Sequence, residues 1–439
     1  MARESEHNTV RGLLQPLGGL FQECRLLQTE CDLSQIPVAV VQSGDLAKLW
    51  PHLKNNRKSG SPLRMSGTGT GARDEDCVVT ALAEAIERYC ACIYTDDQFI
   101  WATAEELGNN ALDLDTIPSC SKTELSHPRC PLVAPDKKAP LRWIQAISLL
   151  DGRSVYVPAV MVFLSAGFAS RAERICIPIS TGCASHTSYE RALLNGIFEV
   201  IERDAISLVW LQKLSLSQIE IDAVPLSLAT FWERYERSSR NLKITFFDAT
   251  TDLGIPTVYG LQVAPGTSLS TMVACSTATD PAVAVAKVIR DMAALRAGFH
   301  GQRPVPKSFE DFDKVFHGAI YMATPERVEA FHFLMQPRPY RRLSEISALP
   351  AGDDRSELRW ILELLRRNGL DVYAIDLTTD EAVRSGVRVV RVLIPALQPL
   401  GFHYRARYLG NPRLYDAPAK MGYPVLPEIQ LNHWPQPFA

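Results

Sequence analysis

The sequence predicts a mixed fold of the α+β class (mixed α/β), and three observations support this. Helical periodicity is strong in four segments, short β-branched runs lie between them, and the two kinds of segment do not alternate in the regular βαβ order of a doubly wound sheet. The helical segments are residues 81–92, 189–211, 283–295 and 356–367. The strand-like runs are residues 36–41, 144–149, 154–158, 243–247, 257–263, 372–377 and 387–393.

The domain organisation follows from length and composition. The chain has 439 residues, 46% of them hydrophobic, which is enough for a sizeable core. Since no low-complexity tract or long linker divides it, we expect an N-terminal subregion over residues 1–60 and one larger domain over residues 61–439. Residues 395–439 are rich in proline, and apolar residues recur among them, which predicts an ordered meander over the surface.

Charge and cysteine usage exclude several classes of protein. A net charge of −3 argues against a binder of nucleic acid or of anionic membranes. The N-terminus is polar and mixed in charge, which is untypical of a signal or transit peptide, and the longest apolar run, residues 157–169, is too short to span a bilayer. The ten cysteines include no C-x-x-C pair, which favours buried reduced thiols. We therefore expect a cytoplasmic protein.

An internal repeat is the most informative feature of the chain. Glu-Ala-Ile-Glu-Arg occupies residues 84–88, and Glu-Val-Ile-Glu-Arg occupies residues 199–203. Each follows a segment of small residues, residues 66–71 (SGTGTG) and residues 180–185 (STGCAS). Seventeen positions separate Gly67 from Glu84, and also Gly182 from Glu199. A loop and a helix are therefore repeated in the same register.

The repeat predicts a site for Mg²⁺ and ATP. Positions i, i+3 and i+4 share one helix face, so three charged side chains project together from each copy: Glu84, Glu87 and Arg88 from the first, and Glu199, Glu202 and Arg203 from the second. Clustered carboxylates repel one another unless cations neutralise them, and Mg²⁺ prefers oxygen ligands. Glycine-rich loops bring backbone N–H groups close to phosphate oxygens. No P-loop motif is present to offer a different nucleotide site.

The alternative interpretation of one such helix is a solvated face that carries an i,i+4 ion pair. A lone glycine-rich loop is equally weak evidence. The matched spacing of both features, found twice, favours a functional site.

Four blocks of the sequence resemble the YcaO superfamily. They are SGTGTGARDEDCVVTALAEAIERYC, PISTGCASHTSYERALLNGIFEVIERDA, PAVAVAKVIRDMAALR and VRVLIPALQPL, and the resemblance runs from Ser66 to the C-terminus. It implies a YcaO fold in which two pseudo-repeated loop–helix units pack around a nucleotide site. It also implies that ATP and Mg²⁺ serve to phosphorylate a peptide amide oxygen.

The resemblance assigns roles to individual residues. The implied Mg²⁺ ligands or their close supports are Glu84, Glu87, Glu199 and Glu202. The implied cofactor-binding residues are these four with Ser66, Gly67, Arg88, Ser180, Glu190, Arg203, Lys287, Asp291 and Arg296, and Arg203 also contacts phosphate in catalysis. For the residues of the third block, an ordinary helix with exposed charges is the alternative. Thr68, Thr181 and Arg191 depart from residues that are common in the family.

The last residues resemble a known subtype. Pro435-Gln-Pro437-Phe-Ala439 is similar to the proline-rich tail of the azoline-forming cyclodehydratases of thiazole/oxazole-modified microcin biosynthesis. The resemblance implies that Pro435, Pro437 and Ala439 act at the catalytic centre, which a tail stiffened by alternate prolines can reach. A disordered proline-rich end is the alternative.

The expected function is ATP- and Mg²⁺-dependent conversion of Cys, Ser or Thr in a ribosomal precursor peptide to thiazoline or oxazoline. The resemblance implies a separate ThiF-like partner that binds the leader peptide, often with a flavin-dependent dehydrogenase, and it leaves a homodimer open. Other YcaO reactions (thioamide or macroamidine formation) and a non-catalytic docking subunit remain alternatives. Candidates for the general base are His186 and the carboxylate of Ala439.

Overall fold

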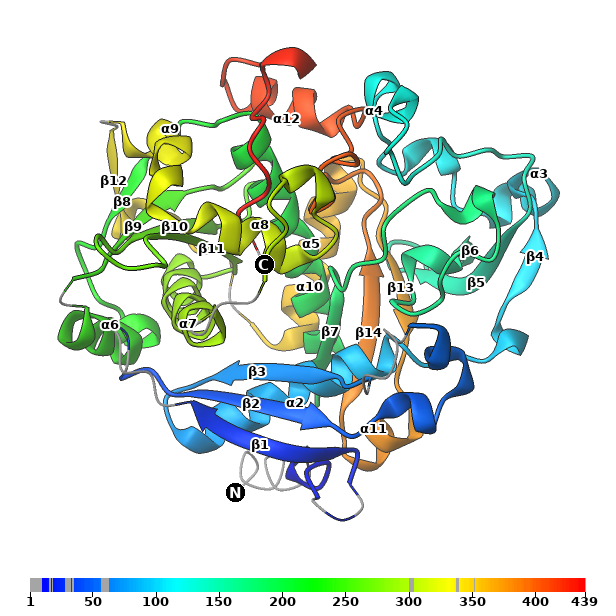
Figure 1. Cartoon of the computed structure of the whole chain (residues 1–439), viewed down its shortest axis with the longest axis horizontal. Coiled ribbons are helices and arrows are strands. Elements are labelled where there is room, and N and C mark those ends of the chain that lie inside the picture. The colour runs from blue at the N-terminus through cyan, green and yellow to red at the C-terminus, as the bar shows by residue number, and fades with distance from the viewer. Residues whose placement is uncertain are drawn as a thin grey trace.

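The computed structural model describes residues 10–15, 17, 19–27, 33, 35–56, 63–239, 241–299, 304–336, 339–350 and 352–438. Helices and three sheets are mixed along the chain (Figure 1), which confirms the predicted fold class. Ala439 lies outside the described residues.

The first sheet is antiparallel and has the order β1 (Phe21–Leu27), β2 (Val38–Ser43) and β3 (Ser66–Thr70). The boundary predicted at residue 60 falls between β2 and β3. The N-terminal subregion and the larger domain therefore contribute strands to one sheet.

The other two sheets are built from later parts of the chain. The second sheet has the order β4 (Ile100–Ala102), β5 (Leu141–Ser148), β13 (Tyr373–Asp376), β14 (Arg388–Leu393) and β7 (Cys183–His186), and β6 (Ser154–Pro158) also pairs with β5. The third sheet has the order β11 (Thr271–Thr277), β10 (Thr257–Val263), β9 (Lys243–Asp248), β8 (Gln218–Glu220) and β12 (Tyr340–Arg342). Only β8 and β12 are parallel among the strand pairs described.

The four predicted helices are present. They are α2 (Asp74–Cys90), α5 (Tyr189–Leu211), α7 (Pro281–Phe299) and α10 (Asp354–Arg367). The structure adds α3 (Ala104–Leu107), α4 (Lys122–Ser126), α6 (Leu226–Ser238), α8 (Val315–Met322), α9 (His332–Met335), α11 (Asp380–Arg384) and α12 (Arg413–Lys420).

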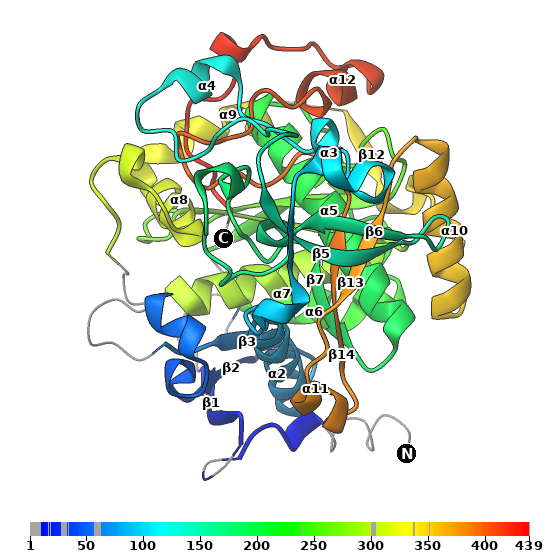
Figure 2. The ribbon, with the colours of Figure 1, turned by 90° about the vertical axis from the view of Figure 1, so that its right-hand side faces the viewer.

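The two repeated helices pack on opposite faces of the second sheet, beside its edge strand β7. Successive side chains of a strand point to opposite faces. Cys183 packs in the same core cluster as Ala85 of α2, whereas Ala184 packs with Ile197 of α5. β7 is the last strand on the path of this sheet, both helices contact it, and it lies between α2 and α5 in both views (Figures 1 and 2).

The predicted glycine-rich loop of the first repeat is a strand, so that part of the prediction is wrong. Residues 66–70 form β3, and this strand lies directly on α2. A Cβ atom on Gly67 would lie 2.1 Å from the carbonyl oxygen of Ala81, and one on Gly69 would lie 2.0 Å from that of Cys77. These glycines therefore allow a strand to touch a helix backbone. In the second repeat, residues 180–182 form a turn before β7.

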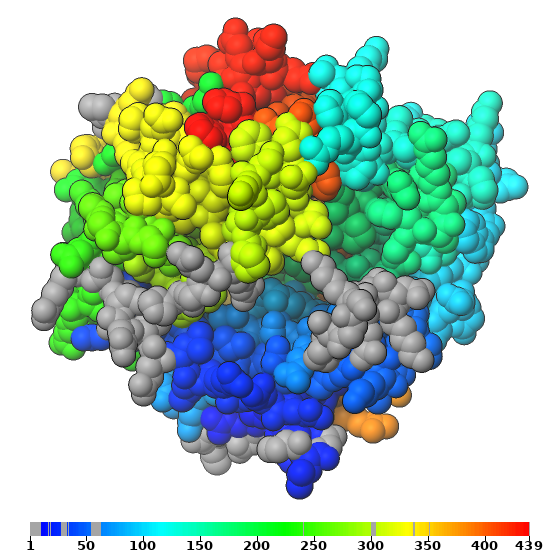
Figure 3. All heavy atoms as spheres, viewed as in Figure 1, coloured from blue at the N-terminus to red at the C-terminus, as the bar shows by residue number. Residues whose placement is uncertain are grey.

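The described part of the C-terminal segment, residues 395–438, is ordered as predicted, but it is not confined to the surface. Leu414 and Phe438 belong to a buried cluster that also contains Trp210 and Tyr259. In the space-filling view the C-terminal segment (red) forms one end of the molecule, and the N-terminal strands (blue) form the opposite end (Figure 3). The prediction of a surface meander therefore needs correction.

Two other predictions concern membranes and cysteines. Within the described residues, no helix combines the length and the apolar character needed to cross a bilayer. The nine described cysteines are all free of disulfide bonds, and Cys31 lies outside the described residues.

Candidate functional site

The first acid of the first repeat is held by its own helix and by β3. Glu84 Oε2 accepts a 2.6 Å hydrogen bond from the backbone N–H of Thr68, and Glu84 Oε1 pairs with Arg88, one turn further along α2. Arg88 Nη1 also donates to the carbonyl of Ser66 at 2.9 Å. The predicted residues Ser66, Glu84 and Arg88 therefore lie together.

The second repeat holds its first acid in the same way. Glu199 Oε2 accepts a 3.2 Å hydrogen bond from the backbone N–H of Gly182, and Arg203 Nη2 lies 3.4 Å from Glu199 Oε1. The φ of Gly182 is +85°, and a Cβ there would lie 2.2 Å from the carbonyl oxygen of Val392. Only glycine suits this turn. Ser180 belongs to the same turn, where its carbonyl accepts from the N–H of Cys183 at 2.7 Å.

The acids of the two repeats converge. Burial, followed by the charges of Glu199 and Glu84, raises the pKa of Glu87 well above its ordinary value, against the opposing charges of Arg88 and Arg391. Burial likewise raises the pKa of Glu199, although Arg203 opposes it. The carboxylate of Glu199 on α5 is therefore close enough to Glu87 on α2 to disfavour the ionisation of Glu87.

Helix α7 contributes a lysine and a further acidic side chain. Lys287 Nζ donates to Glu202 Oε2 at 3.0 Å, and Glu202 also lies 3.7 Å from Arg203. Burial raises the pKa of Asp291, and Lys287 opposes that shift. Lys287 and Asp291 thus lie with the other charged side chains, although the Lys287 side chain is 40% exposed, and their role in binding nucleotide stays a prediction.

Several of the acidic side chains pair with arginine or lysine side chains, so among the described residues they do not form a preassembled metal site. In the part of the chain that the structure describes, no group of three or more His, Cys, Asp or Glu side chains is arranged to hold a metal. Glu84 and Glu202 are engaged by arginine and lysine. The Glu87 side chain makes no hydrogen bond or ion pair among the described residues, and only its backbone carbonyl accepts one, from the N–H of Ala91. This donor set fits Mg²⁺, which takes one or two carboxylates and completes its shell with phosphate and water oxygens.

Arg391 is a residue of this site that sequence reasoning missed. It lies on β14, is 5% exposed, and donates to the carbonyls of Met161 and Ile179 and to Cys183 Sγ. Its charge acts on Glu87. The available signal was a single arginine in an otherwise apolar run, within the block VRVLIPALQPL.

Several predicted residues are placed away from the acids. Arg296 is buried near the end of α7 and donates to the carbonyl of Leu269, in the β10–β11 connection. Glu190 lies in the first turn of α5, about 13 Å along the axis from Glu199 at the usual rise of 1.5 Å per residue. The next residue, Arg191, pairs with Asp354 and Glu357 of α10 and so points away from the site.

His186 is also distant from the acids, so the structure does not support it as a general base. It is exposed at the far end of β7, about 13 Å from Gly182 at the usual strand rise. Its Nδ1 accepts from the backbone N–H of Ser188 at 2.9 Å. Its charge acts on Asp354 of α10, on the outer side of α5.

The proline tail enters the interior. Pro435 and Pro437 are buried, and the Phe438 ring packs edge-on against Tyr259, with 5.5 Å between the centroids. Tyr259 pairs in register with Cys275 of β11, and burial and then the charge of Glu202 raise the pKa of the Cys275 thiol well above its ordinary value. Phe438 therefore lies close to the acid cluster. The predicted role of the Ala439 carboxylate lies outside the described residues.

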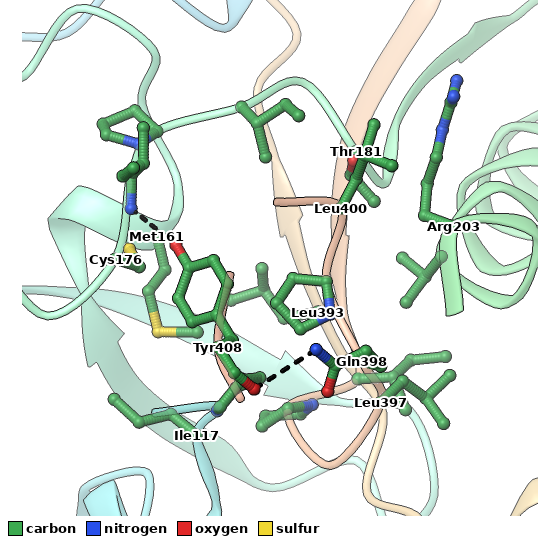
Figure 4. Close-up of a pocket in the computed structure, with 18 of the residues that line it drawn as sticks. Ile117, Met161, Cys176, Thr181, Arg203, Leu393, Leu397, Gln398, Leu400 and Tyr408 are labelled. Carbon is green, nitrogen blue, oxygen red and sulfur yellow. Dashed lines mark hydrogen bonds between the residues drawn. The ribbon is translucent and has the colours of Figure 1, made fainter. Parts of the chain in front are cut away.

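An apolar cavity adjoins the cluster on the side of β14 (Figure 4). Thr181, Arg203 and Arg391 line it together with apolar side chains. Sequence reasoning did not identify this cavity, because its walls come from segments far apart in the chain.

The fold and the site define a class of protein in which two related strand–helix units surround a buried group of acids and cations. The chain belongs to the YcaO family: the family description, YcaO cyclodehydratase, ATP- and Mg²⁺-binding, matches residues 68–398. A protein from Methanothermobacter thermautotrophicus, itself described only as uncharacterized, is 29% identical over 338 residues, covering 75% of this chain and 81% of its own length.

Solved structures share the fold. A heterocyclase in complex with substrate and cofactor matches with a TM-score of 0.79 at 21% identity, over 99% of this chain. YcaO from Methanopyrus kandleri, bound with AMPPCP and Mg²⁺, matches with a TM-score of 0.65 at 18% identity, over 92% of each chain. A chain of the E. coli microcin synthetase McbBCD complex matches with a TM-score of 0.66 at 14% identity, over 97% of this chain and 99% of its own. This chain spans only 57% of the length of the first of these.

Proposed function

We propose that this chain is an ATP- and Mg²⁺-dependent peptide cyclodehydratase that forms thiazolines or oxazolines from Cys, Ser or Thr of a ribosomal precursor peptide. One observation carries the proposal: Glu87 and Glu199, from the two repeated helices, meet beside the cations of Arg88, Arg203 and Lys287. The description of the family as ATP- and Mg²⁺-binding cyclodehydratases supports it.

In this proposal the acidic side chains bind Mg²⁺, and the basic side chains bind the phosphates of ATP. Glu87 and Glu199 would bind Mg²⁺, since Glu87 makes no ion pair among the described residues and Glu199 makes only a long one. Lys287 and Arg203 would move from the acids towards the phosphates, because a bound Mg²⁺ takes over the neutralisation of Glu202 and Glu199. When bound, Mg²⁺-ATP supplies the phosphoryl group that turns an amide oxygen into a leaving group.

The reaction removes one water from the peptide. The thiol or hydroxyl would give up its proton to a base and attack the carbonyl carbon of the preceding residue, and the former carbonyl oxygen would take the γ-phosphoryl group of ATP, with ADP as the leaving group. The amide nitrogen then loses its proton, a C=N bond forms, and phosphate carries the oxygen away. Arg203 would stabilise the negative charge that develops on the transferred group.

The C-terminal tail has a positioning role in this proposal. Pro435 and Pro437 are buried, and the tail reaches Tyr259 beside the acid cluster. A stiff tail fixes the wall against which the peptide would lie. The Ala439 carboxylate remains our candidate for the proton acceptor.

The proposed partners follow from the family and its solved members. The precursor peptide is the substrate, a separate ThiF-like protein would bind its leader, and a flavin-dependent dehydrogenase would oxidise azolines to azoles. Solved relatives include a heterocyclase with substrate and a chain of a microcin synthetase complex, which supports a peptide substrate and partner proteins. We propose the cytoplasm, where ATP and ribosomal peptides occur together.

Mass spectrometry tests the proposal. The purified protein, with its leader-binding partner, is incubated with Mg²⁺, ATP and a Cys-containing precursor peptide. We expect a mass loss of one water per modified residue, with one ADP formed for each. The Glu84→Gln and Glu199→Gln variants should be folded and inactive.

The same measurement separates the alternatives. Exchange of one oxygen for sulfur, in the presence of a sulfide source, identifies thioamide formation. Loss of water that joins an amine of the peptide to a backbone amide identifies a macroamidine. A folded protein that binds no Mg²⁺-ATP, alone or with its partner, is a docking subunit and contradicts the enzyme assignment.

A further inference from the structure

The apolar cavity beside β14 has a defined size and lining. Its walls include Ile117, Met161, Ile179, Leu393, Leu397 and Leu400, several of which are labelled in Figure 4. Its volume is about 100 Å³. A cavity of roughly 150 Å³ with similar walls binds benzene. The space therefore suits a branched aliphatic side chain better than a purine base.

The cations that line the cavity are already neutralised or hydrogen-bonded. Arg391 donates to two carbonyls and to Cys183, and Arg203 pairs with Glu199 and Glu202. No carboxylate side chain belongs to the described lining. Burial of a charged group there would be costly without a free partner, so the occupant is uncharged and apolar.

The chain itself does not fill this cavity with its described tail. Phe438 packs on Tyr259 of the third sheet, whereas the cavity is lined by β14 and the segments around it. Gln398 also lines the cavity, and its amide nitrogen lies 3.3 Å from the carbonyls of Arg407 and Tyr408. Its Oε1 is buried and has no hydrogen-bond partner among the described residues, so it is available to accept from an N–H of an incoming group.

The cavity touches the reaction centre at Arg203. In the proposed cyclodehydration, the carbonyl that is attacked belongs to the residue before the Cys, Ser or Thr. The Cα of that residue is bonded to the reacting carbon, so its side chain cannot lie far from Arg203. We propose that this cavity receives an aliphatic side chain of the residue that precedes the cyclised position and thereby selects the modification site. The inference rests on the proposed function.

A peptide library tests this inference with the full chain and its leader-binding partner. The substrate is the precursor peptide, randomised only at the position before one Cys, with Mg²⁺ and ATP present. We expect Leu, Ile, Val and Met to be enriched over Asp, Ser and Gly by at least about tenfold among molecules that lost water, because burial of such side chains is favourable by that much or more. Equal modification of all library members would overturn the inference.

A variant with a larger side chain in the cavity provides a second test of the inference. Ile179→Phe should shift the preference to Gly and Ala, with the affinity for Mg²⁺ and a non-hydrolysable ATP analogue unchanged within about threefold. Ile429→Phe, at a position that is 91% exposed, is the matched control and should keep the original preference. Loss of nucleotide affinity in Ile179→Phe would overturn the inference and make the cavity a nucleotide pocket. If no library member loses water although the nucleotide binds, the proposed function fails, and this inference fails with it.

Discussion

The backbone N–H of Thr68 donates a 2.6 Å hydrogen bond to Glu84, and that bond has a counterpart from Gly182 to Glu199 at 3.2 Å. In each repeat, a backbone donor just before the helix and an arginine one turn later hold the first acid between them. The repeat is therefore one of geometry as well as of sequence. The side chain at position 68 takes no part in this contact.

Because the donor is the backbone, we predict that the identity of the side chain at position 68 matters little. Thr68→Ala and Thr68→Lys should keep the affinity for Mg²⁺ and an ATP analogue within about threefold, measured by isothermal titration. Thr68→Pro removes the N–H and should weaken binding by at least about tenfold. A tenfold loss in Thr68→Ala would show that the hydroxyl itself contacts the nucleotide.

We predict that Gly67→Ala destabilises the protein irrespective of nucleotide. The added Cβ would lie 2.1 Å from the carbonyl of Ala81, so β3 would have to move off α2. The free energy of unfolding should fall by at least about 2 kcal/mol in urea titrations. Gly298→Ala, where nothing lies within 4 Å, is the control and should be neutral or slightly stabilising. Equal stability of both variants would contradict the close packing of β3 on α2.

Stability without metal should depend on pH through Glu87. Burial and the charges of Glu199 and Glu84 raise the pKa of Glu87 in the folded protein. A carboxyl whose pKa is higher in the folded than in the unfolded protein does not lower the free energy of unfolding below the unfolded pKa of about 4.3. As pH rises from there towards the raised pKa, this carboxyl lowers the free energy of unfolding. The melting temperature in EDTA should therefore fall as pH rises above about 4.3, and less steeply in Glu87→Gln.

A surface acid provides the control for this titration. Hydrogen bonds from Arg366 and Arg367 lower the pKa of Glu363 to about 2, so this carboxyl stays ionised throughout the range. Glu363→Gln should leave the pH slope unchanged. If the melting temperatures of Glu87→Gln and Glu363→Gln change with pH by the same amount, the pKa of Glu87 is not raised by its surroundings.

We predict that the buried pair of Asp204 and Arg413 anchors α12 to α5. Asp204 is fully buried beside Arg203 in the sequence, and Arg413 Nη2 lies 2.8 Å from its Oδ2. Arg413→Met leaves that charge without its cation and should cost about 3–5 kcal/mol of unfolding free energy. Arg366→Met breaks a solvent-exposed pair with Glu363 and should cost much less unfolding free energy than Arg413→Met. Similar losses in both would contradict the anchoring role.

Much of the fold could be predicted from periodicity. The bounds of α5, β6 and β10 agree with the segments inferred from the sequence. The strand β3 was missed because glycine disfavours strands locally, and the compensating contact with α2 is visible only in three dimensions. The fully buried strand β11 was also missed, because a continuously buried strand shows no alternation.

The candidate site was predictable to a similar extent. The acids of both helices and Lys287 could be named, because they share helix faces and family motifs. Arg391 and the apolar cavity could not, since they depend on the pairing of β14 with β7 and on segments distant in the chain. Arg296 was named from the same motif; the structure shows it donating to the carbonyl of Leu269, and its role at the site stays a prediction.

The central claim is that both repeated helices form one Mg²⁺-ATP site, and calorimetric titration of single variants tests it most directly. Wild-type protein, Glu84→Gln, Glu199→Gln and the control Glu363→Gln are titrated with a non-hydrolysable ATP analogue in the presence of Mg²⁺. We predict one bound nucleotide per chain in the wild type and the control. Each of the two site variants should lose affinity by at least about tenfold. Retention of wild-type affinity by either site variant, in a protein that remains folded, would contradict a site shared by the two helices.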